Sequence, residues 1–177
     1  MSWLSYILFI FILYSFLGWV LEEVYCFIVT GHFKKDGFLS GPFKPMYGFA
    51  MAIIVYISEF TRINNVLLWS SFLIVPTLIE YISGYLMKRY FNKMYWDYSN
   101  NKFNIDGFVC LRFSFYWIFL IAFVVYILQP LIEIEYYNYF NFISNITPIF
   151  LGYLLIDFVM TVKRLKQNLR IKEIDVK

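Results

Sequence analysis

Acidic side chains lie inside stretches of this sequence that are otherwise apolar. Glu80 and Asp157 each fall within a long hydrophobic run, and Glu22 and Glu23 fall in the last third of another. A charge at bilayer depth costs about 2.5 kcal/mol or more, so such a carboxylate usually faces a partner or a water-filled cavity. Two interpretations follow. The acids either form buried ion pairs between helices or line an inward-facing polar cavity, where carboxylates can act as acids, bases or ligands.

Small residues accompany two of these acids at helical spacing. Gly18 lies four residues before Glu22, and Pro76 and Gly84 lie four residues on either side of Glu80. Residues four apart share one face of a helix, so a neighbouring chain segment can approach closely beside each carboxylate. We predict a cavity that contains Glu22, Glu80, Asp157 and Arg112. In the alternative, Arg112, Lys88 or Arg164 would be ion-pair partners of the acids.

The elements that must position these side chains are membrane helices. The chain is 61% hydrophobic and 24% aromatic, with 15% charged residues, which excludes an ordinary soluble domain. Apolar runs cover approximately residues 3–29, 46–58, 66–87, 111–132 and 142–162. All but the second reach the roughly 20 residues that a spanning helix needs. The second reaches that length only if its helix begins at Pro45 and Glu59 or Phe60 lies at the interface.

These runs are continuous rather than alternating, which favours helices over a β-barrel. We therefore predict an all-α, polytopic membrane protein with about five transmembrane helices. Of the fifteen basic residues, all but Arg62 lie in the first loop, the third loop or the C-terminal segment. Short basic loops stay in the cytoplasm, so the N-terminus should be outside and the C-terminus inside. This gives one helical domain (1–162) with cytoplasmic loops at 30–45 and 88–111, and a basic cytoplasmic tail at 163–177.

The first of these loops, "GHFKKDGFLSGPFKPMYG" (31–48), is irregular in a chain of apolar helices. Glycine permits positive φ and close approach, and proline fixes φ. We expect a defined lid that packs against the loop "YWDYSNNKFNIDGFVCLR" (95–112) beneath the carboxylates; the alternative is two ordinary turns. The motif residues of these loops are Gly31, Phe38, Gly41, Pro42, Pro45, Tyr47, Gly48, Trp96, Asp97, Tyr98 and Ser99.

Other residues that could do chemistry are sparse. Cys26 and Cys110 are far apart and have no clustered histidine or cysteine beside them, so we expect packing residues, no metal site and no cofactor. His32 is more typical of a loop hydrogen-bonder than of a proton relay. Tryptophans 19, 96 and 117 are expected to be interfacial anchors.

Several ordered motifs resemble one known family. They are "GWVLEE" at 18–23, the 31–48 stretch, "LIEYISGYLMKRYF" at 78–91, "WDYS" at 96–99 and "NIDGFVCL" at 104–111. Over residues 5–120 the chain is similar to the bacterial membrane family called "putative ABC-transporter type IV", or CmpB-like. The resemblance implies a permease role in a bacterial cell membrane. Besides the loop motif residues, it covers Gly18, Trp19, Glu22, Glu80 and Cys110.

The chain departs from the pattern of that family at two positions. Lys44 stands where a cysteine is common, and Phe108 stands where an arginine follows the glycine of the second loop. If that arginine pairs with a membrane carboxylate in relatives, this chain must use another cation or keep the acid neutral. Arg112, one turn further on, is the expected substitute.

Three functions remain open at this point. A permease subunit would need a separate ATPase subunit, because the chain contains no G-x-x-x-x-G-K-[ST] phosphate loop. It would also need a homo-oligomer or a second membrane subunit to enclose a path. The alternatives are a membrane enzyme acting on a lipid or isoprenoid at the cytoplasmic leaflet, or a small accessory subunit whose tail "KRLKQNLRIK" contacts anionic lipid. Membrane lipid is an expected partner, and nucleic acid is not.

Overall fold

The computed structural model describes residues 3–33 and 37–175, with side chains described to residue 171. The elements are α1 (Trp3–Thr30), α2 (Pro45–Phe60), α3 (Asn65–Phe91), β1 (Asn104–Ile105), β2 (Val109–Cys110), α4 (Leu111–Phe123), the π-helical turn η1 (Val124–Leu128), α5 (Gln129–Asn138) and α6 (Phe140–Asp175). The chain is thus an all-α, multi-pass membrane protein, as predicted.

Four helical segments are long and apolar enough to cross a membrane: Trp3–Thr30, Asn65–Phe91, Leu111–Asn138 and Phe140–Ile171. The third of these is α4, η1 and α5 in one continuous run. Helix α2 begins at Pro45 and ends at Phe60, the bounds that the sequence required for a fifth span. Its 16 residues measure about 24 Å at about 1.5 Å per residue, which is short for a hydrocarbon core of about 30 Å.

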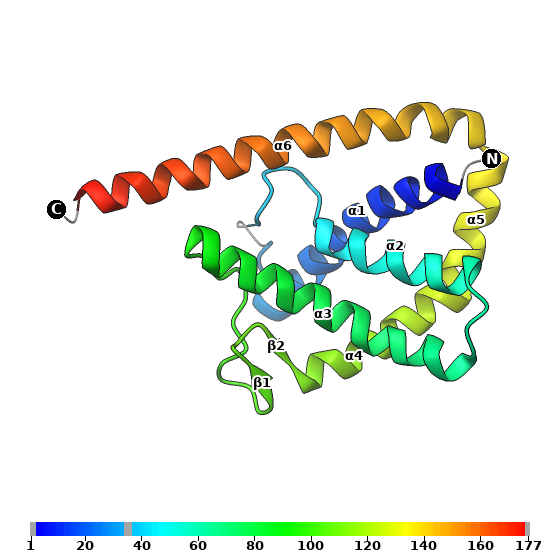
Figure 1. Ribbon diagram of the computed structural model, residues 1–177, viewed down its shortest axis with the longest axis horizontal. Helices are drawn as coiled ribbons and strands as arrows, with labels where there is room; N and C mark the ends of the chain where they lie inside the picture. The colour runs from blue at the N-terminus through cyan, green and yellow to red at the C-terminus, as the bar shows by residue number, and fades with distance from the viewer. Residues whose placement is uncertain (1–2, 34–36, 176–177) are drawn as a thin grey trace.

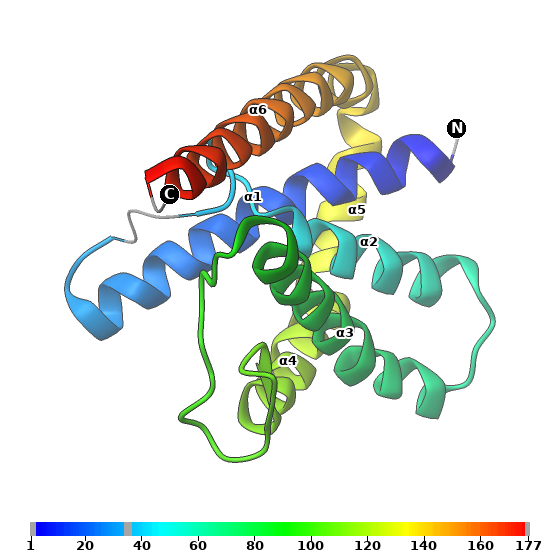
Figure 2. The ribbon, with the colours of Figure 1, turned by 60° about the vertical axis from the view of Figure 1, so that its left-hand side comes forward.

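The bundle is held by close packing of α1 on α2 (Figure 1, Figure 2). A β-carbon on Gly48 of α2 would overlap Ser15 Oγ and the Phe11 carbonyl oxygen of α1, and one on Gly18 would overlap the Tyr47 ring. The main apolar core lies on the N-terminal half of α1, with Ile10 and Ile54 fully buried against Phe72 of α3. Small residues at these crossings therefore let the two backbones approach each other.

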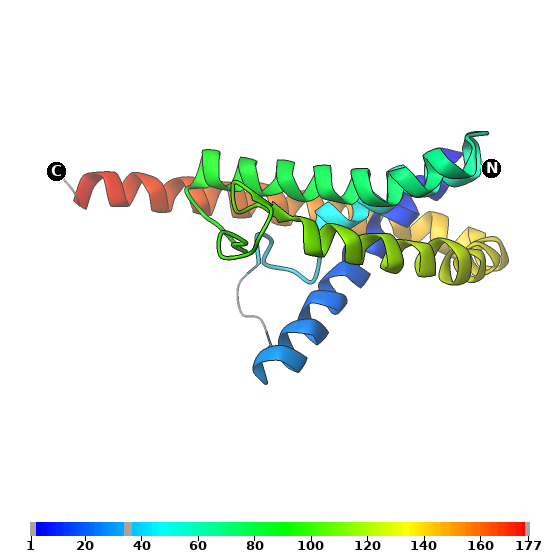
Figure 3. The ribbon, with the colours of Figure 1, turned by 90° about the horizontal axis from the view of Figure 1, so that it is seen from below.

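Further along, α1 separates from the other helices. Figure 3 shows its C-terminal half running away from the layer formed by α3, α4 and α6. Large side chains there remain exposed, among them Val24, Tyr25, Phe27 and Ile28. The divergence opens the space between α1 and α4 in which the candidate site lies.

Between α3 and α4 the chain forms a small hairpin that the sequence analysis did not predict. Strands β1 and β2 pair antiparallel, with Ile105 opposite Val109. Asp106 and Gly107 at the turn have φ of 53° and 73°. Positive φ at both central residues is the condition for a tight hairpin turn with an Asp-Gly sequence. The "IDGF" segment was therefore a readable hairpin signal.

A π-helical turn interrupts the run from α4 to α5. It ends at Leu128, directly before Gln129 and Pro130. Proline lacks an N–H and clashes with the carbonyl four residues earlier, and a widened turn relieves that clash. The turn leaves Gln129 with its side chain buried, at 2% exposure.

Helix α6 is 36 residues long, or about 54 Å at about 1.5 Å per residue. It runs alongside α1 and projects past the end of α3 (Figure 1). The segment predicted as a basic tail, from residue 163 onward, continues this helix to Asp175 rather than leaving it. Its basic residues Lys163, Arg164, Lys166 and Arg170 thus extend along a helical rod.

The orientation of the bundle across the membrane is a prediction with a direct test. The segment 133–139, expected to be an outer loop, is helical except at Tyr139, where α5 and α6 meet. We expect a reporter that works only in the cytoplasm to be active at Lys177, and one that works only outside to be active at Tyr139. Exchanging the two reporters should silence both. If both exchanged reporters are active, the topology is the reverse of the predicted one.

Candidate functional site

A cavity of about 510 Å³ lies between α1, α2, α3, α4 and the segment that precedes the hairpin. We call it the acidic chamber, because Glu22, Glu80 and Asp97 line it. Aromatic side chains form much of the remaining wall, including Tyr25, Tyr47, Trp96, Tyr98, Tyr116 and Trp117. The structure therefore brings Glu22 and Glu80 together in one chamber with the motif residues Tyr47, Trp96, Asp97 and Tyr98.

A second cavity of about 290 Å³, the apolar chamber, lies beside it. The two share Leu21, Met46, Tyr47, Glu80, Trp117 and Leu120 as wall residues. Beyond these, aliphatic side chains such as Leu17, Met51 and Val124 line the apolar chamber. The combined space is thus polar towards the loops and apolar towards the middle of the bundle.

Glu22 is held by the beginning of α2. The Lys44 ammonium forms an ion pair with Glu22 Oε2, and the Tyr47 hydroxyl donates to Glu22 Oε1 at 3.1 Å. The Lys44 backbone N–H donates to the Ser15 carbonyl of α1 at 2.8 Å, which fixes the start of α2 against α1. The positive end of the α2 dipole points to the same place and also favours a carboxylate there.

Glu80 is buried, at 4% exposure, and both of its oxygens accept hydrogen bonds. The Tyr98 hydroxyl donates to Oε1 at 3.0 Å, and Trp117 Nε1 donates to Oε2 at 3.1 Å. Burial, and next the Glu80 carboxylate, raise the pKa of Tyr98 well above its usual range, so its hydroxyl remains a donor. Trp117, expected to be an interfacial anchor, instead positions a buried carboxylate.

The second loop is folded by its own hydrogen bonds, which hold residues 96–98 at the mouth of the chamber. The Tyr98 N–H donates to the Gly107 carbonyl, and Trp96 Nε1 donates to the Phe108 carbonyl, both at 2.8 Å. Asp97 accepts from the Ser99 hydroxyl and the Ser99 N–H, and these bonds lower its pKa below the usual value. Asp97 is therefore ionised at neutral pH.

Phe108, where the resembled family has arginine, is a packing residue in this chain. Its ring lies against Gly84, where a β-carbon would come within 2.8 Å of Phe108 Cδ1. The Lys88 ammonium lies 5.6 Å from the ring centroid. The glycine one turn from Glu80 thus admits a neighbouring side chain, as its spacing indicated.

Asp157 lies elsewhere, which corrects its predicted place in the cavity. Its Oδ2 accepts the Gly41 N–H at 2.8 Å and its Oδ1 accepts the Ser40 N–H at 3.2 Å. A β-carbon on Gly41 would overlap the Tyr153 hydroxyl and lie 3.1 Å from Asp157 Oδ2. Asp157 therefore binds the first loop to α6. Position 41 requires glycine because the loop backbone there approaches Tyr153 and Asp157 closely.

Arg112 also lies outside the acidic chamber, so its expected pairing with a carboxylate is wrong for the described residues. Its Nε donates to the Tyr116 hydroxyl at 3.0 Å, and its side chain is exposed. Within the described part of the chain, a membrane acid meets Lys44, the other departure from the family pattern. Lys34 and Lys35 of the first loop lie outside the described residues.

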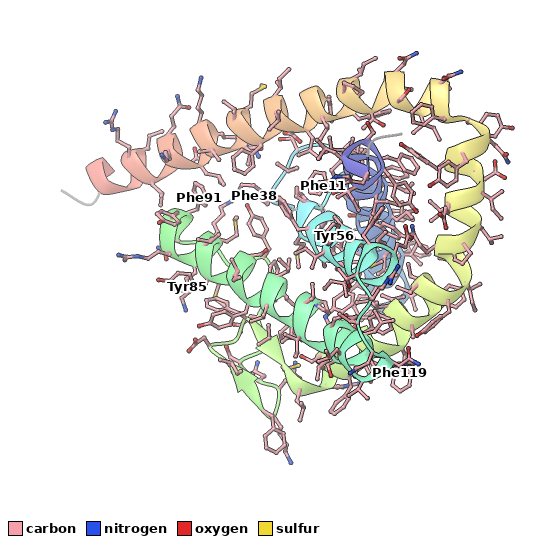
Figure 4. The ribbon with its side chains drawn as sticks, turned by 45° about the vertical axis from the view of Figure 1, so that its right-hand side comes forward. Phe11, Phe38, Tyr56, Tyr85, Phe91 and Phe119 are labelled. Atoms are coloured by element: carbon pink, nitrogen blue, oxygen red, sulfur yellow. The ribbon has the colours of Figure 1, made fainter. Side chains whose placement is uncertain are left out.

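The first loop docks only in part as predicted. Among the described residues, Phe38 meets Tyr95 at the beginning of the 95–112 loop, at 6.5 Å between ring centroids. Further contacts of the first loop run to α1, α3 and α6. Leu39 and Phe43 pack with Ile12 and Leu154. Phe38 lies 5.9 Å from Phe91 and 5.7 Å from Phe158 between ring centroids, bridging α3 and α6 (Figure 4).

The backbone of that loop follows a defined path at its motif residues. Gly31, at φ 75°, ends α1 and donates its N–H to the Phe27 carbonyl at 2.8 Å. Pro42 lies at the centre of a tight turn, in which the Phe43 N–H donates to the Gly41 carbonyl at 2.9 Å. Pro45 then begins α2.

A buried polar network near the opposite end of the bundle escaped the sequence analysis. The Tyr14 hydroxyl donates to Gln129 Oε1, and Gln129 Nε2 donates to the Tyr6 hydroxyl, both at 2.7 Å. Tyr6 in turn donates to Glu59 Oε1 at 3.2 Å. The available signal was the amide of Gln129 next to Pro130 within an apolar run.

The family model described as "Putative ABC-transporter type IV" matches residues 9–162. No curated protein and no solved structure matches the chain.

Proposed function

Because the chain belongs to the family described as "putative ABC-transporter type IV", we propose that it is a permease-like membrane subunit of an ABC-type transport system. In this proposal the acidic chamber binds the transported molecule. Family membership and the long apolar helices support the assignment as a membrane protein related to ABC transporters. The acidic chamber supports the proposal that this chain binds the transported molecule.

The observation that carries the proposal is the shape and lining of the joined chambers. Small-molecule sites are concave and mostly apolar, with a few fixed polar groups that orient the ligand. The acidic and apolar chambers together have this character. The acidic chamber, at about 510 Å³, is of the size that such sites have, and the apolar chamber, at about 290 Å³, lies just below that range. The polar groups are also fixed, since Tyr98 and Trp117 hold Glu80 and Lys44 holds Glu22.

A separate ATPase subunit is the second part of the proposal. The first loop, the hairpin and the projecting end of α6 lie at the same end of the bundle (Figure 1). In the predicted topology this end faces the cytoplasm, where an ATPase would dock. The exposed apolar half of α1 is the surface on which a second copy or another membrane subunit would complete a transport path.

The contacts favour this function over a lipid-modifying enzyme. An enzyme would need one carboxylate free to act as acid or base and a cation nearby to hold phosphate. Both Glu80 oxygens accept hydrogen bonds, Glu22 is paired with Lys44, and Arg112 turns to Tyr116. This arrangement suits a ligand that is held rather than one that exchanges protons with the acids.

Affinity purification from the membranes of the native host tests the proposal. With an affinity tag after Lys177 and mild detergent, we expect mass spectrometry to find an ATPase subunit with a phosphate loop, and the eluate to hydrolyse ATP. The Glu80→Gln variant should retain this partner, because Glu80 lies inside the bundle. Recovery of lipid-biosynthetic enzymes without an ATPase, or of this chain alone after cross-linking, would reject the permease role.

A further inference from the structure

We propose that the acidic chamber selects an amphipathic organic cation, whose charged head lies among the carboxylates and aromatic rings and whose apolar part enters the apolar chamber. This inference rests on the proposed function in taking the chamber as the ligand site, and it adds the chemical class of the ligand. The inference holds equally if the protein binds such a cation without transporting it.

The charge of the chamber is the first argument. Glu22, Glu80 and Asp97 line it, and none of the lining residues in the described part of the chain is Lys, Arg or His. Lys44 reaches Glu22 from outside this wall and balances one carboxylate. Lys88 acts electrostatically on Asp97 from outside the wall. Because no cation among the described residues lines the wall itself, the chamber attracts a positive ligand and repels an anion.

Aromatic side chains supply the second argument. The rings of Tyr47 and Trp117 meet edge to face, at 5.6 Å between centroids, and Tyr98 stacks on Phe113 at 4.9 Å. All four of these residues line the acidic chamber, and aromatic faces attract organic cations when water is excluded. Tyr98 and Trp117 also donate to Glu80, so the carboxylate and its aromatic neighbours form one fixed unit.

The apolar chamber decides between an organic and an inorganic cation. It shares Glu80 and Trp117 with the acidic chamber and is otherwise lined by apolar side chains such as Leu17 and Met51. A small metal ion would gain nothing from that space. It would also need several converging ligands, and the described residues include no group of three His, Cys, Asp or Glu placed to hold one.

Tetraphenylphosphonium and tetraphenylborate test the inference, because they share size and shape and differ in the sign of their charge. The purified protein in nanodiscs of neutral phosphatidylcholine would be titrated with each, following its tryptophan fluorescence, with empty nanodiscs subtracted. We expect saturable binding of the cation, at least tenfold tighter than any binding of the anion. Equal binding of both ions, or binding of the anion alone, would overturn the proposal.

Three variants locate the binding. Glu80→Gln should weaken cation binding by at least about tenfold, while Glu135→Gln, an exposed acid at the far end of the bundle, should leave it unchanged. Lys44→Met should strengthen it, because the ammonium that pairs with Glu22 is removed and the chamber becomes more negative. Wild-type affinity in Glu80→Gln, with an unchanged unfolding temperature, would place the cation elsewhere and reject the site.

The two proposals can fail separately. Selective cation binding without an ATPase partner would retain the ligand class and remove the permease role. An ATPase partner without cation selectivity would do the reverse.

Discussion

Replacing Gly48 by alanine is expected to destabilise the bundle by about 3 kcal/mol, in the upper part of the range for overpacking. The added β-carbon would overlap the Phe11 carbonyl oxygen and Ser15 Oγ, and it would lie 2.8 Å from Phe11 Cδ2. Because one obstacle is backbone, no rotamer change removes the clash. The two helices must move apart, which also shifts Lys44 and Tyr47 away from Glu22.

Gly152 provides the matched control, since it is also a helical glycine in an apolar span. A β-carbon there has no neighbour within 4 Å. Alanine is favoured over glycine in a helix by about 0.5–1 kcal/mol, so Gly152→Ala should be neutral or slightly stabilising. Thermal unfolding in detergent, followed by size-exclusion chromatography, measures both variants. Equal stability of the two would contradict the close crossing of α1 and α2.

Removing the Lys44 ammonium should cost about 3 kcal/mol and lower the unfolding midpoint by about 6–12 °C. The side chains of Lys44 and Glu22 are 12% and 20% exposed, so the acid left behind in Lys44→Met would be largely without water. This places the cost at the lower end of the range for breaking a buried pair. Glu22→Gln should cost a similar amount, because it leaves the ammonium unpaired.

The double variant Glu22→Gln with Lys44→Met separates the contribution of the ion pair to stability from the contribution of side-chain packing. Without either charge, no group is left uncompensated, and most of the lost stability should return. Lys163→Met, which removes an exposed lysine of α6, should change the midpoint little. If the double variant is as unstable as the sum of the single ones, Lys44 and Glu22 act independently and the ion pair does not hold α2 in place.

Much of the helical architecture could be predicted from the sequence because it follows from local properties. Apolar length fixed the spans, and Pro45 marked the beginning of α2. The spacing of Gly18 and Gly84 from Glu22 and Glu80 indicated close approach, which Tyr47 and Phe108 provide. Periodicity within one helix is sufficient for these inferences.

The assignment of partners failed where it depended on how helices are placed around each other. Asp157 belongs to α6, where it meets the backbone of the first loop instead of the chamber. Arg112 lies in the first turn of α4 and donates a hydrogen bond to the Tyr116 hydroxyl. Lys44 was noted only as a departure from a family pattern, because its contact with Glu22 depends on the crossing of α1 and α2. Spacing along one helix carries no information on such contacts.

The uninterrupted length of α6 has a mechanical consequence. Asp157 and Asp175 are joined by about 27 Å of continuous helix, at about 1.5 Å per residue. A force applied at the projecting end is therefore transmitted as a tilt of a stiff lever rather than absorbed by a hinge. The short arm of that lever holds the Ser40 and Gly41 amides, only a few residues from Lys44. A force at the C-terminal end of α6 would thus act on the same loop segment that contains Lys44, the counter-ion of Glu22.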